Sequence, residues 1–123
     1  MSSTSARNVD RRFVIDLSLR MVIDRLTSAV DRAHSSKGDP NTSKQSWEDA
    51  QENVCIEARS AFTTYLGVME WRGSPDAIAT EFLREELARA LDVLDPTLPY
   101  LNAVKEKLEA LERYVEERQV GAH

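Results

Sequence analysis

The stretch RRFVIDLSLRMVIDRL, residues 11–26, is too apolar for an ordinary surface helix and too charged for a membrane span. When its residues are placed at about 100° intervals, the apolar side chains fall on two roughly opposite faces of one helix. The first face carries Ile15, Leu19, Val22, Ile23, Leu26 and, further along, Val30. The second face carries Phe13, Val14, Leu17 and Met21. The first half of this helix is therefore predicted to have packing partners on two sides.

The second face has two explanations. Either the other helices of the chain wrap the first helix on both sides, or this face meets another protein. A four-helix bundle needs only one apolar stripe from each member, so the surplus favours an intermolecular contact. Trp71 and Arg72 form a second candidate contact, because Trp and Arg are the residues most enriched at interface hot spots. Trp71 would equally serve as a cap over the end of the bundle. The predicted interface residues are Phe13, Val14, Leu17, Met21, Trp71 and Arg72.

Gly, Pro and small polar residues divide the rest of the chain. Residues 1–8 are predicted to be a flexible tail, and residues 9–120 a single helical-bundle domain. The first helix is expected over 9–34, and SSKGDPNTSKQ, residues 35–45, is expected to be a mobile, passive loop. Ser46 and Asp49 resemble a capping box that opens a second helix, which Gly73 ends after Arg72.

Two further helices are expected. Ser74 and Pro75 suit the start of the third, which runs to about Leu94, and the fourth covers about 99–119. In the fourth, apolar residues recur at alternating spacings of three and four, at Leu101, Val104, Leu108, Leu111 and Val115. No segment shows sustained strand alternation. The predicted fold is an all-α, four-helix, mostly antiparallel bundle with a long first helix.

Composition limits the function classes. The chain has 123 residues, of which 41% are hydrophobic and 30% charged, as in an ordinary globular domain. A net charge of −5 without an obvious basic face argues against a nucleic-acid partner. Cys55 is the only cysteine, so no internal disulfide can form. The N-terminal residues lack an apolar run of signal-peptide length, and we expect a cytoplasmic protein that does not bind a membrane.

Catalytic and metal-binding patterns are missing from the sequence. There is no Glu-x-x-His pair, phosphate-binding Gly-rich loop or nucleophile elbow. His34 suits a helix C-terminus, and His123 is the last residue. Cys55 borders an apolar face and is interpreted as a small core residue rather than a nucleophile. We therefore predict no catalytic residue, no metal and no cofactor.

The sequence favours a non-enzymatic association module: a homodimer or other homo-oligomer, or a small adaptor, immunity or accessory subunit. The alternative is a small all-α enzyme or a protein that binds an anionic ligand through Arg12 and Arg20. These arginines alternate with Asp16 and Asp24 at four-residue spacing, which also allows pairing along the helix. Arginines on a long first helix followed by KGDP, residues 37–40, resemble chorismate mutases, which are small all-helical enzymes. The further catalytic residues of that family cannot be placed in this sequence, so the chain is not assigned to it.

Overall fold

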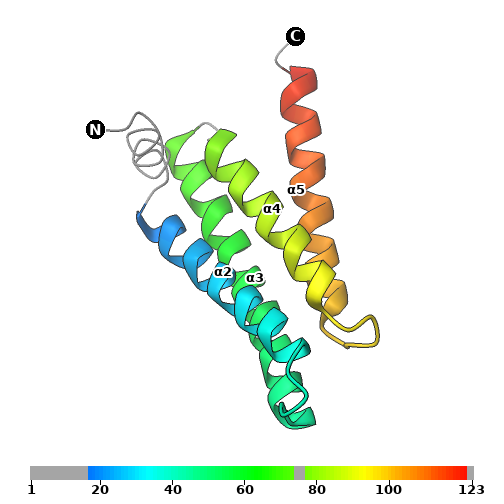
Figure 1. The fold of residues 1–123 in the computed structure, drawn as a ribbon. Coiled ribbons are helices and arrows are strands. Elements are labelled where there is room, and N and C mark those ends of the chain that lie inside the picture. The colour runs from blue at the N-terminus through cyan, green and yellow to red at the C-terminus, as the bar shows by residue number, and fades with distance from the viewer. Residues whose placement is uncertain (1–16, 74–76, 122–123) are drawn as a thin grey trace, which may run out of the picture.

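Four helices make up the regular structure of the residues described by this computed structural model, which are 17–73 and 77–121. They are α2 (Leu17–Lys37), α3 (Lys44–Arg72), α4 (Ala77–Val93) and α5 (Leu101–Gly121). Of the described residues, 86% are helical and none lies in a strand, so the predicted all-α, four-helix fold is confirmed. Figure 1 shows consecutive helices running in opposite directions along the bundle. None of these helices is both long and apolar enough to cross a membrane.

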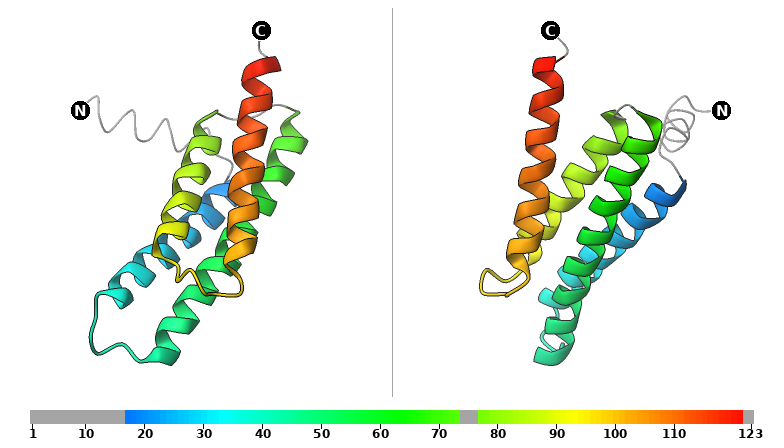
Figure 2. Two further views of the ribbon diagram at one scale, coloured as in Figure 1. Left: turned by 90° about the vertical axis from the view of Figure 1, so that its right-hand side faces the viewer. Right: turned by 180° about the vertical axis from the view of Figure 1, so that it is seen from behind.

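The helices are arranged as a central pair with one helix on either side. The central helices α3 and α4 contact each other, and both of them contact α2 and α5. The outer helices α2 and α5 share almost no contact, and the right-hand view of Figure 2 shows them on opposite sides of the central pair. In its described part, α2 is therefore an edge helix, packed on one side by α3 and α4.

The core follows the apolar periodicity of the helices. The buried residues of α2 recur at spacings of three and four, so that they share one face. They are Leu19, Val22, Ile23, Leu26, Ala29, Val30 and Ala33. This is the first face predicted from the sequence, apart from Ile15, which lies outside the described residues. Val54, Ala58, Phe62 and Tyr65 of α3 belong to the same core.

Tyr65 joins three helices at the centre of this core. Its side chain is fully buried, and its hydroxyl lies 2.7 Å from the hydroxyl of Thr80 on α4. Its ring meets the ring of Tyr114 on α5 edge-on, with the centroids 6.1 Å apart. The Nζ atom of Lys107 on α5 lies 5.4 Å from the ring centroid of Phe62 on α3. Aromatic contacts from α3 therefore hold α5 against the bundle.

The start of α3 differs from the prediction. Ser43, not Ser46, is the N-cap: its backbone is extended, and its Oγ accepts a hydrogen bond of 3.1 Å from the backbone N–H of Ser46. Asp49 does not complete a capping box with Ser46, since its carboxylate accepts from Gln45 Nε2 at 3.0 Å. The prediction for Ser46 was wrong because two serines three residues apart both fit the N-cap pattern.

The other boundaries agree more closely. Gly73 ends α3 as predicted, with a left-handed φ of 73° and its N–H donating to Met69 O and Glu70 O. The first helix continues to Lys37, so the loop before α3 is shorter than the predicted 35–45. At 29 residues α3 is the longest of the described helices, against 21 for α2. The predicted tail 1–8, the helix start at 9–16, and Ser74 with Pro75 lie outside the described residues.

Candidate association surface

The outer face of α2 begins with two exposed apolar side chains. Leu17 is 65% exposed and Met21 is 50% exposed. Both belong to the second face predicted from the sequence, and they point away from the core because the buried residues of α2 occupy the opposite side of the helix. The other two members of that face, Phe13 and Val14, lie outside the described residues. Where the structure describes it, the second face is not covered by the chain's own helices.

The apolar part of this outer face is short. After Met21 the same side of α2 carries Asp24, Arg25 and Ser28, all of which are exposed. Further along, the outward positions are again polar. The apolar surface of α2 is therefore limited to its first described turns.

Trp71 and Arg72 lie at the C-terminal end of α3. Both are exposed, and Trp71 is 81% exposed, which does not fit the alternative of an indole packed over the bundle end. Figure 1 shows the end of α3 and the start of α2 at the same end of the bundle. We call Leu17, Met21, Trp71 and Arg72 together the end surface. The start of α2 and the end of the next helix, α3, thus bring all the described members of the predicted interface to one end of the molecule.

Only part of the predicted row of alternating charges on the first helix lies in the described residues. Arg20 is half-buried and Asp24 exposed, while Arg12 and Asp16 lie outside the described residues. Although Arg20 and Asp24 are four residues apart on α2, no ion pair joins them among the ion pairs of residues 17–73 and 77–117. Of the two arginines predicted to bind an anion, only Arg20 is described, and it forms no ion pair with the neighbouring Asp24.

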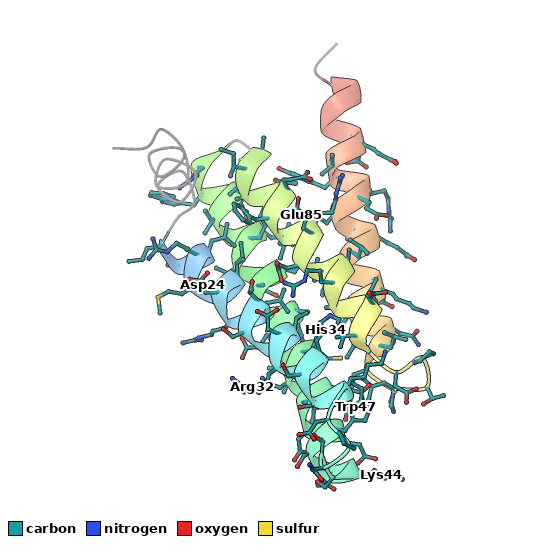
Figure 3. The ribbon with its side chains drawn as sticks, in the orientation of Figure 1. Asp24, Arg32, His34, Lys44, Trp47 and Glu85 are labelled. Carbon is teal, nitrogen blue, oxygen red and sulfur yellow. The ribbon has the colours of Figure 1, made fainter. Side chains whose placement is uncertain are left out.

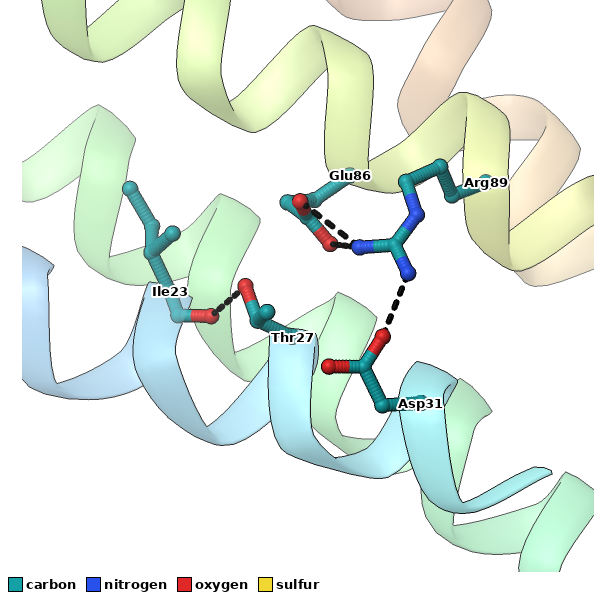
Figure 4. A network of polar contacts seen from close by, with 5 residues as sticks. All are labelled: Ile23, Thr27, Asp31, Glu86 and Arg89. Atoms are coloured by element: carbon teal, nitrogen blue, oxygen red, sulfur yellow. Dashed lines mark hydrogen bonds and ion pairs between the residues drawn. The ribbon is translucent and has the colours of Figure 1, made fainter. Parts of the chain in front are cut away.

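An ion pair that α2 does form lies further along the helix, at Asp31. Arg89 of α4 donates to Glu86 Oε2 at 2.9 Å and also pairs with Asp31 of α2 (Figure 4). The hydrogen bond to Asp31, and after it that to Glu86, raises the pKa of Arg89. Thr27 donates to the carbonyl of Ile23 at 2.9 Å within α2. This network links α2 to α4.

The structure places Cys55 and His34, the residues considered as a nucleophile and as a ligand, in different surroundings. Cys55 is buried, and this burial, followed by the nearby charge of Glu52, raises the pKa of its thiol to about 11. A thiol with this pKa stays protonated at neutral pH and is a poor nucleophile. His34 is exposed on α2. In the described part of the chain, no three His, Cys, Asp or Glu side chains group closely enough to hold a metal ion.

Two surface hollows, of about 550 and 540 Å³, lie at the opposite end of the bundle. They flank Trp47, which Figure 3 places near Lys44 at the start of α3. Asp95 lines both: its backbone N–H donates to Gln51 Oε1 at 2.6 Å, and its carboxylate accepts from the N–H and hydroxyl of Thr97, which lowers its pKa. No histidine or cysteine lines either hollow. The sequence did not indicate them, because they form where two loops meet.

Comparison of the chain with protein-family models, with curated proteins and with solved structures finds no match.

Proposed function

We propose that this chain is an association module that pairs with a second copy of itself through the end surface. The observation that carries the proposal is the exposure of Leu17 and Met21 on the outer side of an edge helix. A contiguous apolar surface beside polar residues is typical of a protein contact site. The exposed indole of Trp71 at the same end of the bundle adds the side chain that most often anchors such a contact.

The charges near the end surface favour a second copy as the partner. Positive and negative side chains both lie on or near this surface, although the net charge of the chain is −5. They are Arg20, Arg25 and Arg72, and Asp24 and Glu70. A surface that carries both signs can complement itself across a two-fold axis. A strongly acidic or basic partner would be matched by a surface of one sign.

The exposed area implies a weak dimer. If the exposed parts of Leu17, Met21 and Trp71 were buried in both copies, they would contribute on the order of 10 kcal/mol before the cost of association. That cost is about 4–15 kcal/mol, so at most about 6 kcal/mol remains, which corresponds to a dissociation constant of about tens of micromolar or weaker.

Sedimentation equilibrium over a concentration series tests the proposal. The wild-type chain should approach twice its 13.9 kDa mass as concentration rises, and Leu17→Glu should stay a folded monomer because it would bury a charge in the contact. Ser35→Glu is the matched control: Ser35 is exposed at the same angular position on α2, five turns further along, and its variant should dimerise like wild type. A wild type that stays monomeric up to about millimolar concentration, or a Leu17→Glu chain that dimerises normally, would contradict the proposal.

A further inference from the structure

The hollow of about 540 Å³, between the first turns of α3 and the residues that lead into α5, combines aromatic side chains with an excess of carboxylates. We call it the Tyr100 hollow. Trp47 of α3 and Tyr100, which directly precedes α5, both line it. Its lining contains four Asp or Glu residues and one lysine, so its charge is negative. Aromatic rings and carboxylates are the groups that together bind an organic cation.

Two of these carboxylates, Glu48 and Glu52, have no cationic partner within the described part of the chain. They lie four residues apart on α3, where like charges repel each other. The lysine of the hollow, Lys44, is four residues before Glu48 but forms no ion pair with it in the described structure. The other two carboxylates, of Asp49 and Asp95, already accept hydrogen bonds from neighbouring residues. A bound cation would therefore relieve the repulsion between Glu48 and Glu52.

A buried amide at the Tyr100 hollow has a donor to spare. Gln51 is only 2% exposed, and its Oε1 accepts a hydrogen bond of 2.6 Å from the backbone N–H of Asp95. Its Nε2 has no acceptor among the described residues, where no fully buried side-chain nitrogen or oxygen lacks a partner. Nε2 is therefore accessible, and it reaches the hollow that Gln51 lines. There it can donate to a carbonyl oxygen of a bound molecule.

From these groups we infer that the Tyr100 hollow binds an arginine of an extended polypeptide segment. The guanidinium is held by the aromatic side chains and the Glu48–Glu52 pair, and a backbone carbonyl of the segment accepts from Gln51. Arginine suits the hollow better than lysine, because a planar guanidinium both stacks on aromatic rings and donates in parallel to carboxylate oxygens. Free arginine suits it less well, because its α-carboxylate would approach the carboxylates of the lining. The hollow is at the opposite end of the bundle from the end surface, so this site is independent of the proposed dimer.

The fluorescence of Trp47 tests the site. The chain has two tryptophans, so in a Trp71→Phe chain the emission comes from Trp47 alone. Titration with N-acetyl-arginine amide at constant ionic strength should change this emission saturably, with a dissociation constant of about 1 mM, as is typical of a ligand of about fifteen non-hydrogen atoms. N-acetyl-citrulline amide, in which a neutral urea replaces the guanidinium, should bind about tenfold more weakly. Butylguanidinium, which lacks the carbonyl, should bind about threefold more weakly.

Variants of the same chain assign the binding to this hollow. Glu48→Gln/Glu52→Gln should weaken binding of the arginine compound about tenfold, because it removes both unpaired carboxylates. Glu57→Gln is the matched control: it removes a negative charge from the other flank of α3, lines neither hollow, and should change the dissociation constant by less than about twofold. Tyr100→Phe keeps the ring and should bind like the parent chain, whereas Tyr100→Ser should bind about threefold more weakly. Circular dichroism checks that each variant folds.

Three results would overturn the inference. The first is no saturable change up to about 20 mM of the arginine compound, or equal binding of the arginine and citrulline compounds. The second is unchanged affinity in a folded Glu48→Gln/Glu52→Gln chain, which would place the binding elsewhere. The third is tighter binding of free arginine than of the capped compound, which would exclude a polypeptide as the ligand. None of these results bears on dimerisation through the end surface, which sedimentation measures separately.

Discussion

The hydroxyl of Tyr65 is expected to stabilise the fold, and Tyr65→Phe tests this with little change in shape. The substitution removes one atom from a fully buried side chain that lies 2.7 Å from Thr80 Oγ1. A net hydrogen bond contributes about 0.5–1.5 kcal/mol, and the loss is larger when a buried partner is left behind. Since Thr80 has further interactions, we expect Tyr65→Phe to lower the free energy of unfolding by about 1–2 kcal/mol. That is a substantial part of the roughly 5–15 kcal/mol typical of a domain.

The assay is urea unfolding followed by the helical circular dichroism signal. The midpoint should fall while the dependence on urea concentration stays the same. Thr80→Val should also destabilise, and the double variant should lose less than the sum of the single losses, by roughly 1 kcal/mol. Tyr100→Phe is the control, because Tyr100 is exposed and its hydroxyl is not part of the core. Single variants within about 0.3 kcal/mol of wild type, or fully additive losses, would refute the reasoning.

Three further predictions concern the ends of α3 and the buried thiol. Ser43→Ala should lower the free energy of unfolding by about 1 kcal/mol, and by more than Ser46→Ala, because Ser43 provides the N-cap; urea unfolding of both variants measures this. Gly73→Ala should cost about 1 kcal/mol in the same assay because of the left-handed φ of 73°, and an unchanged midpoint would contradict it. Cys55 should resist iodoacetamide at neutral pH until the chain unfolds, since burial raises its pKa to about 11. The unfolded thiol ionises at lower pH than the folded one, so between about pH 9 and 11 wild type should lose stability faster than Cys55→Ala.

The helices and the core were predictable because helix periodicity determines which residues share a face. The spacing of Leu19, Val22 and Leu26 was enough to identify the buried side of α2. The same periodicity identified Leu17 and Met21 as a second apolar group. It could not determine which helices would be neighbours, and so could not decide whether that group would be covered by the same chain.

Features that depend on loops or on competing local signals were not predictable in this way. The N-cap of α3 was assigned to the wrong serine because Ser43 and Ser46 both precede helical sequence with a polar residue three positions later. The hollows around Trp47 arise where the loop before α3 meets the loop before α5. Such features depend on the backbone path of segments that carry no periodic pattern.

The placement of α5 at one edge of the bundle has a consequence for local opening. This helix packs on α3 and α4, and among residues 101–117 its buried side chains are Leu101, Val104 and Leu111, so none follows Leu111 in that range. Because α2 sits on the far side of the central pair, α5 can detach while the part of α2 that carries Leu17 and Met21 keeps its packing on α3 and α4. The amide protons near the C-terminal end of α5 would then exchange with solvent by fraying, at a lower free energy than those of α3, while the face that carries Leu17 and Met21 stays intact.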